Sequence, residues 1–138
     1  MRTGDDVAVL SIGHIGNLAT KGIDRLEAEG YSVAHYDMRF VKPIDELLLH
    51  EVFSKFKHVV TVEDHGLHGG MGSAVLEFMG DHGYAAHVKR LAIPDTFIEH
   101  GTQAELYREC GIDAIAVVEA VKEMVGEKKL SKDIKASA

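Results

Sequence analysis

The stretch EDHGLHGGMGS, from Glu63 to Ser73, is the part of this sequence best suited to chemistry. It follows a β-branched run and precedes a helical pattern, so backbone N–H groups and a helix N-terminus can approach an anion there. It lacks the Lys-Ser/Thr pair of a P-loop and the spacing of a dinucleotide fingerprint. Gly70 and Gly72 therefore have a second interpretation, which we favour: they let a helix pack tightly on its sheet or on a neighbouring domain.

Histidine is the second candidate for chemistry, with nine in 138 residues. His65 and His68 stand beside Glu63 and Asp64, and imidazole and carboxylate groups are ligands of zinc and other transition metals. A tetrahedral site needs a further ligand, and the sequence spacing places none. We therefore expect no metal site, and we expect hydrogen bonding at a surface or interface for these histidines and for His14, which follows an earlier strand.

Two cations, Arg39 and Lys42, form a compact basic pair in the segment DMRFVKPID. Such a pair can bind a carboxylate or a phosphate. The simpler interpretation is a salt bridge to Asp37 or Asp45, or a contact with a partner chain.

The single cysteine, Cys110, excludes an internal disulfide and any multi-cysteine metal site. It lies late in a predicted helix beside Glu109, which favours a buried structural thiol over a reactive one. No nucleophile elbow with a Ser-His-Asp order and no HExxH motif is present. Taken alone, these residues predict a soluble α/β domain that serves as a binding or docking module.

The elements that must position these side chains alternate along the sequence. Short β-branched runs over residues 7–12, 31–37, 58–63 and 87–93 predict strands, and the amphipathic stretches between them predict helices. We expect a helix from Gly13 to a C-cap at Gly30, one with Pro43 in its first turn and Leu47 facing inward, and one around 74–79. Two more are expected over 102–110 and after the cap Asp113, the last with an inward face that includes residues 115 and 118. This is the pattern of a layered α/β domain.

Length and charge narrow the function classes. The 138 residues predict one domain over 1–126 and a frayed, lysine-rich tail over 127–138. A net charge of −7 argues against nucleic acid and anionic membrane as partners. No apolar run reaches the length of a membrane span, and the first residues lack the layout of a signal peptide. We expect a cytoplasmic protein.

Three segments together resemble the C-terminal domain of the 1-deoxy-D-xylulose-5-phosphate synthase family. They are DMRFVKPID (37–45), VVTVEDHGLHGGMGSAV (59–75) and IPDTFIEHGTQAELYRECGID (93–113), and they occur in the family's order. More distantly, the pattern is similar to the C-terminal domains of transketolase and of the β subunit of 2-oxo acid dehydrogenases. The resemblance implies a three-layer α/β/α fold around a five-stranded, mostly parallel (mixed) sheet with one antiparallel edge.

The resemblance also implies an activity for a longer protein. In its full-length form the family condenses pyruvate with glyceraldehyde 3-phosphate with loss of CO2, using thiamine diphosphate and Mg2+, and the product feeds isoprenoid, thiamine and pyridoxal synthesis. Two preceding domains, the catalytic N-terminal domain and the pyrimidine-binding domain, supply that site, and this sequence contains neither. The opening residues MRTG fall where the family has a linker, so we expect an excised piece of a longer protein.

The family's cofactor motif begins Gly-Asp-Gly and ends in an asparagine some tens of residues later. Here the nearest start is Gly80-Asp81-His82, and the only asparagine, Asn17, precedes it. We therefore expect no catalytic, cofactor-binding or metal residue in this chain, and no turnover by it alone. Its expected partners are the remaining domains of the same enzyme and its homodimer mate. The candidate contacts are Arg39, Lys42, Glu63, His65, His68, Gly70 and Gly72.

Three hypotheses stay open. The first is a non-catalytic domain that serves packing and dimer assembly. On that hypothesis, valine at Gly70 or Gly72 disrupts assembly more than it destabilises the isolated domain. The second is a stand-alone module of the same fold that binds an anion or a partner at the glycine-rich loop. The third is a small enzyme that uses Glu63, His65 and His68.

Overall fold

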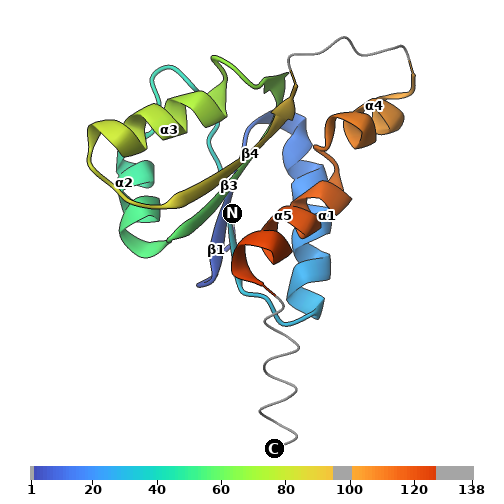
Figure 1. The fold of residues 1–138 in the computed structure, drawn as a ribbon, viewed down its shortest axis with the longest axis horizontal. Helices are drawn as coiled ribbons and strands as arrows, with labels where there is room; N and C mark the ends of the chain where they lie inside the picture. The colour runs from blue at the N-terminus through green and yellow to red at the C-terminus, as the bar shows by residue number, and fades with distance from the viewer. Residues whose placement is uncertain (1, 95–100, 127–138) are drawn as a thin grey trace, which may run out of the picture.

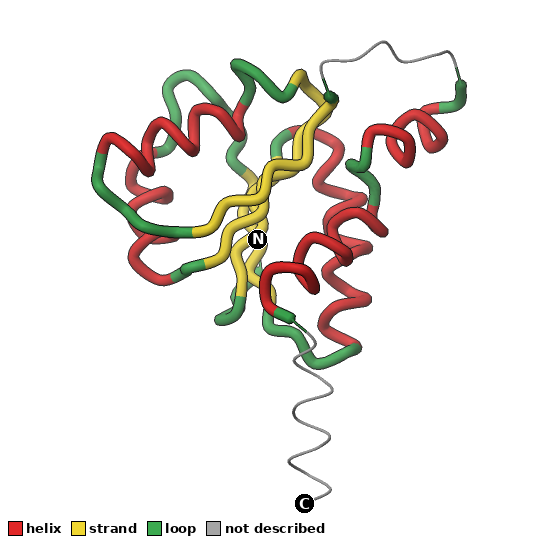
Figure 2. The backbone as a smooth tube through the Cα atoms, in the orientation of Figure 1, coloured by secondary structure: helices red, strands yellow, loops and turns green. Residues whose placement is uncertain are grey.

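The computed structural model describes residues 2–94 and 101–126, which form a parallel sheet between two helical layers (Figures 1 and 2). The strands are β1 (Val7–Ser11), β2 (Val33–Asp37), β3 (His58–Gly66) and β4 (His87–Ile93), in the order β2-β1-β3-β4. A short 3-10 turn (Gly13–Ile15) leads into α1 (Gly16–Ala28), which shares one face of the sheet with α5 (Ala114–Val125). The other face carries α2 (Glu46–Lys55) and α3 (Met71–Asp81), and α4 (Gln103–Cys110) precedes α5.

The central strands belong to two cores. All five residues of β1 are buried, because helices cover both faces of the sheet. Val7 and Val9 pack toward α1 and α5, whereas Ala8 and Leu10 pack toward α2 and α3. The alternation of side chains along a strand thus divides one apolar run between two hydrophobic layers.

The three-layer α/β/α architecture predicted from the sequence is confirmed. The described residues contain four strands, all parallel, where the resemblance implied five in a mixed sheet. An antiparallel component is limited there to an isolated bridge between Arg2 and His35, beside the edge strand β2. The apolar run near Phe97, considered for a further strand, lies outside the described residues, as does the tail over 127–138.

The start of α2 differs from the prediction. The Asp45 carboxylate accepts the Leu48 N–H at 3.0 Å and caps the helix, so Pro43 lies in the preceding turn and not in the first helical turn. This start directs Leu49 and neighbouring apolar residues inward, and it leaves Leu47 84% exposed.

The inward face of α5 also differs from the prediction. Ala114, Val117 and Val121 are buried, whereas Ile115 is 40% exposed and Val118 is only partly buried. The two caps predicted before the last helices are present: Thr102 accepts the Glu105 N–H at 3.2 Å, and Asp113 accepts the Ala116 N–H at 2.9 Å. None of the helices in the described part of the chain is long and apolar enough to span a bilayer.

Candidate functional site

The candidate residues gather at one edge of the sheet. In a parallel sheet all strands end at the same edge, which we call the carboxyl edge, and ligands of such folds usually bind there. Arg39 and Lys42 follow β2, His14 follows β1, and the segment from Glu63 to His68 ends β3 and begins the glycine-rich loop. The order β2-β1-β3-β4 makes the β1–β3 pair the point where the chain reverses its direction across the sheet.

Glu63 is the buried anion at the centre of this edge. Strand β3 extends to Gly66, so Glu63 lies within the strand, and this residue is 1% exposed. Its carboxylate accepts the N–H groups of Met71 at 2.6 Å and Gly72 at 2.9 Å, the first residues of α3. A negative charge is favourable at a helix N-terminus, and hydrogen bonds to a carboxylate are strong. The chain's own carboxylate thus takes the position that a bound phosphate would take.

The two glycines singled out from the sequence lie against this cap. A Cβ at Gly70 would collide with the Glu63 carboxylate, and a Cβ at Gly72 would lie 2.9 Å from Thr61 Oγ1 and 3.0 Å from Arg90 Cδ. Gly72 and Glu63 are buried. Both glycines therefore pack against groups of their own domain, and the assignment of Glu63, Gly70 and Gly72 as contacts with a neighbouring domain stays a prediction.

A hydrogen-bond network that we did not predict from the sequence holds the rest of the glycine-rich loop. Arg90 Nη1 donates to the Leu67 carbonyl oxygen at 3.0 Å and contacts Ser73 Oγ at 3.4 Å. The Ser73 hydroxyl also donates to the Leu67 carbonyl at 3.1 Å and accepts the Gly69 N–H at 3.2 Å. A cation within the apolar run HVKRLAI was the available signal, because a guanidinium in a half-buried strand needs acceptors.

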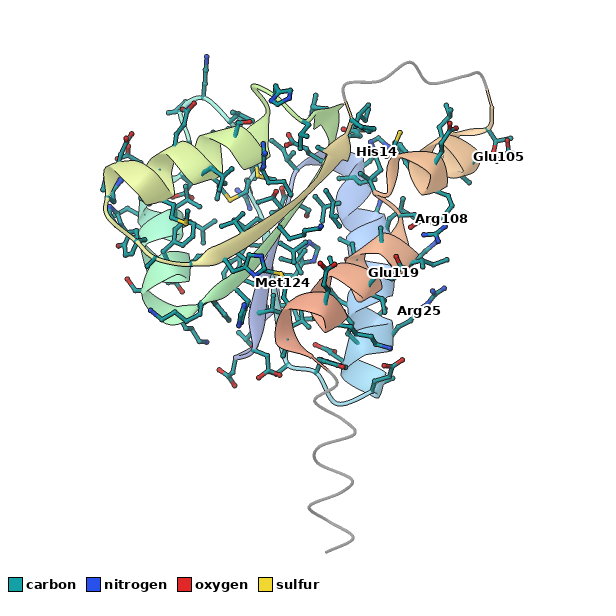
Figure 3. All side chains as sticks on the ribbon, in the orientation of Figure 1. His14, Arg25, Glu105, Arg108, Glu119 and Met124 are labelled. Atoms are coloured by element: carbon teal, nitrogen blue, oxygen red, sulfur yellow. The ribbon has the colours of Figure 1, made fainter. Side chains whose placement is uncertain are left out.

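The β1–β3 reversal point is also filled by the chain's own side chains. His14 Nε2 is hydrogen-bonded to the Tyr107 hydroxyl at 2.6 Å, and that hydroxyl donates to Asp64 Oδ2 at 3.4 Å. His14 Nδ1 lies 3.6 Å from the same carboxylate oxygen, and His65 Nδ1 lies 3.7 Å from Asp64 Oδ1. Figure 3 shows His14 at the end of the sheet nearest α4. Nothing in the sequence singles out Tyr107, because its partners are 43 and 93 residues away.

The remaining candidates are exposed. Arg39 and Lys42 form no ion pair within the described residues, so the salt bridges expected from the sequence are not made there. Asp37 Oδ1 instead accepts the backbone N–H of Arg39 at 3.0 Å. His65 is likewise exposed, and so is His68 in the loop that follows it.

A cleft of about 430 Å3 separates the turn after β2 from α3. Its lining includes the polar residues Lys42, Glu77, Asp81 and His82 and the aromatic residue Phe78. A second cleft, of about 360 Å3, opens beside Phe40. Both clefts flank the segment that carries Arg39 and Lys42.

The described residues do not fit the cofactor that the resemblance implies for the longer protein. Gly80 and Asp81 are the last residues of α3, and a helix C-terminus repels a diphosphate. The N-terminus of the same helix is taken by Glu63. Within residues 2–94 and 101–126, no group of three or more His, Cys, Asp or Glu side chains could hold a metal ion.

Burial shifts the pKa values of His35 and Cys110. Burial lowers the pKa of His35, whose Nε2 is hydrogen-bonded to the Ser11 hydroxyl at 2.7 Å. Burial also raises the pKa of the Cys110 thiol, with a further contribution from Glu109. Cys110 is only partly buried, and the raised pKa agrees with the structural role predicted for it.

Comparison with known proteins gives relatives that share one name. The chain is 59% identical over 123 residues to the 1-deoxy-D-xylulose-5-phosphate synthase of Cytophaga hutchinsonii, a match that covers 89% of the chain and 19% of the relative. The enzyme of the same name from Bacteroides thetaiotaomicron is 60% identical over 114 residues, covering 82% and 18%. The chain thus spans about a fifth of the length of these relatives.

Solved structures give the same fold. The structure titled "Split gene transketolase, inactive beta4 tetramer" is 35% identical with a TM-score of 0.81, covering 92% of this chain and 40% of that one. Campylobacter jejuni transketolase, at 17% identity and a TM-score of 0.57, covers 86% and 17% and is similar in fold alone. Residues 1–117 match the family described as "Transketolase, C-terminal domain". With most of its length matched, the chain belongs to the family of transketolase C-terminal domains.

Proposed function

We propose that the chain serves as the C-terminal, non-catalytic domain of a 1-deoxy-D-xylulose-5-phosphate synthase. In its full-length form this enzyme condenses pyruvate with glyceraldehyde 3-phosphate and releases CO2. The proposal rests on relatives that carry this name and are 59% and 60% identical to the chain. We assign the thiamine diphosphate and Mg2+ of that reaction to the rest of the enzyme, and we place the enzyme in the cytoplasm.

The observation that carries the non-catalytic role is the cap on α3. Glu63 fills the helix N-terminus that a phosphate group would otherwise occupy. Tyr107, His14 and Asp64 fill the β1–β3 reversal point in the same way. Both places where a fold of this type offers a ligand site are therefore satisfied by the chain itself, and the carboxyl edge is left with exposed side chains suited to contacts between proteins.

The role that remains is assembly. The exposed candidates Arg39, Lys42, His65 and His68 are the contacts that we assign to the remaining domains of the enzyme and to its homodimer mate. Glu63, Gly70 and Gly72 support this surface from beneath by fixing the loop and α3.

The size of the native polypeptide is the first test. An antibody raised against this chain should detect, in source-cell lysate, a polypeptide several times larger than 15.1 kDa. That larger polypeptide, once purified, should form 1-deoxy-D-xylulose 5-phosphate, whereas the 138-residue chain should not. A native band at 15 kDa would contradict the proposal.

A binding measurement separates the alternative of a stand-alone module. On our proposal, the 138-residue chain binds neither thiamine diphosphate nor glyceraldehyde 3-phosphate in calorimetry. Saturable binding that Gly70→Val abolishes would favour an anion-binding module, because a valine there displaces the Glu63 cap and deforms the loop.

A further inference from the structure

Two histidines meet where α2 and α3 lie on the same face of the sheet (Figure 1). His50 lies on α2, and His82 is the residue that ends α3. Their ring centroids are 4.7 Å apart, with an angle of 89° between the ring planes. Two imidazoles on one metal ion, each with a metal–nitrogen distance of about 2.0–2.1 Å, have ring centres roughly 4.5–5.3 Å apart when the angle at the ion is about 90–110°. The separation of His50 and His82 is therefore that of a pair of metal ligands.

The neighbouring phenyl ring shows from which side His50 approaches His82. Phe78 stacks on one face of His82 with centroids 4.1 Å apart, and its centroid lies 4.8 Å from that of His50. His50 therefore stands beside this stack and not over the open face of His82. A ring nitrogen of imidazole carries its lone pair in the plane of the ring, so a metal binds at the ring edge. His50 is thus on a side of His82 from which an ion can be shared.

In each of the two rings, one nitrogen is held by a neighbouring group. His82 Nδ1 donates to the Phe78 carbonyl oxygen at 2.9 Å, which leaves Nε2 with the lone pair of the neutral ring. His50 Nδ1 is hydrogen-bonded to the Tyr84 hydroxyl at 2.6 Å. Neither Nε2 atom forms a hydrogen bond with a described residue. Histidines that bind metals are oriented in this way, because the second ring nitrogen donates to a carbonyl oxygen or another acceptor.

The cleft of about 430 Å3 that His82 lines carries an excess of negative charge. The carboxylates of Glu46, Glu77 and Asp81 belong to its lining, where one lysine opposes them. A negatively charged cleft concentrates cations from solution and disfavours phosphate compounds. His82 is exposed and His50 is partly exposed, so an ion that enters the cleft can reach His82. The electrostatic surroundings therefore favour a cation at this pair.

We propose that His50 and His82 together bind one Zn2+ or similar divalent transition-metal ion, with Tyr84 and the Phe78 carbonyl as the groups that orient the two rings. Imidazole nitrogen suits Zn2+, Cu2+ and Ni2+, whereas Mg2+ and Ca2+ prefer oxygen ligands. Within the described residues no third His, Cys, Asp or Glu completes a ligand set, so water fills the remaining positions. The bound ion ties α2 to the end of α3. This site departs from our expectation of no metal residue, which considered only the glycine-rich loop and the family's cofactor motif. It is independent of the proposed function, because both ligands belong to this chain.

Calorimetry with Zn2+ tests the site on the 138-residue chain, purified with a chelator and without a histidine tag. The tightest binding should involve one Zn2+ per chain, and an equal concentration of Mg2+ should not compete with it. The double variant His50→Gln with His82→Gln should weaken this binding by at least about tenfold. An unmodified chain that does not bind Zn2+, or a double variant that binds it with the original affinity, would overturn the proposal.

A second pair of histidines provides the matched control. His58 and His87 are register partners on β3 and β4, but their ring centroids are 6.2 Å apart, which is beyond the separation of two ligands at the angles given above. His58→Gln with His87→Gln also removes two imidazoles and should leave the affinity for Zn2+ unchanged. An equal loss of affinity in the two double variants would show unspecific binding by surface histidines and would refute the site.

Two further measurements retain both ligands, so they do not depend on a histidine variant that folds. In the unmodified chain, Zn2+ should shift the imidazole NMR signals of His50 and His82 at lower concentration than those of the other histidines. Tyr84→Phe removes the partner of His50 Nδ1 and should weaken Zn2+ binding by about tenfold. Signals that shift first at other histidines would place the ion elsewhere and overturn the site. Unchanged affinity in Tyr84→Phe would refute the orienting role of the Tyr84 hydroxyl.

Discussion

The buried carboxylate of Glu63 stands where any side chain at Gly70 would have to be placed. The carboxylate reaches this position because β3 carries Glu63 to the start of α3, where the N–H groups of Met71 and Gly72 are donors without helical partners. One interaction thus joins strand, loop and helix. The glycine is required by the space that the carboxylate takes, since a Cβ at position 70 would collide with it.

Glu63→Gln should destabilise the chain by roughly 1–3 kcal/mol, because it replaces a charged acceptor of two N–H groups with a neutral amide. Urea unfolding of the 138-residue chain measures this loss. Glu77→Gln is the control, since Glu77 is an exposed carboxylate on the same helix. Equal midpoints for both variants would show that the cap contributes nothing to the free energy of unfolding.

Two glycines of α3 should respond to alanine with opposite signs. Gly72→Ala places a Cβ 2.9 Å from the buried Thr61 hydroxyl and should lower the melting temperature. Gly80→Ala meets no atom within 4 Å and should raise the free energy of unfolding by about 0.5–1 kcal/mol through helix propensity. Thermal unfolding of the two variants gives the comparison. Shifts of the same sign would mean that packing at Gly72 does not control the response.

These contacts change the expectation for valine at Gly70 or Gly72. The sequence analysis led us to expect a loss of assembly greater than the loss of domain stability. Both glycines pack against groups of their own domain, so we now expect Gly70→Val and Gly72→Val to lower the melting temperature of the 138-residue chain itself. Unchanged melting with lost assembly in the full-length enzyme would support the first expectation.

Acid should destabilise the chain through His35. Burial lowers the pKa of His35 below its ordinary value, so the folded state favours the neutral ring, which is hydrogen-bonded to Ser11. The folded state therefore binds fewer protons than the unfolded state below the ordinary pKa of about 6.5. This contribution to stability is complete above that pH and is lost as the pH falls through the lowered, folded-state pKa.

Melting temperatures recorded between about pH 7.5 and pH 5 should therefore fall less for His35→Gln than for the unchanged chain. His87→Gln, at an exposed position at the start of β4, serves as the control and should retain the full decrease. A decrease as steep in His35→Gln as in the unchanged chain would assign the acid sensitivity to other groups.

Tyr107→Phe should loosen α4 without unfolding the domain. The Tyr107 hydroxyl joins α4 to His14 at 2.6 Å and to Asp64 at 3.4 Å. Removing the hydroxyl should speed amide exchange over residues 103–110 by about tenfold, because segments with few tertiary contacts open locally. Glu109→Gln, on the same helix, should leave that exchange unchanged. A variant whose α4 exchanges at the original rate would show that other contacts hold the helix.

Periodicity predicted the layers because each strand and helix is long enough to show its buried face. It assigned Leu47 to the core wrongly, because the Asp45 cap and not the apolar pattern sets the start and phase of α2. The sequence indicated that Gly70 and Gly72 matter for packing. It could not show which groups they pack against, because β3 brings Glu63 and Thr61 next to them only in the folded chain. Tyr107 could not be selected from the sequence, because its partners come from distant segments that only the fold brings together, whereas Arg90 carried a signal as a cation in an apolar strand.

The capped α3 helix has a consequence for how the domain meets its surroundings. The Glu63 carboxylate is tethered beside the N-terminus of α3. It therefore competes with free phosphate esters for the N–H groups of Met71 and Gly72 at an effective concentration that is typically millimolar or higher. The helix N-terminus therefore stays closed while metabolite levels rise and fall around it. On the proposed function, the carboxyl edge then offers a constant surface for assembly, because the capped helix N-terminus does not respond to the level of phosphate compounds.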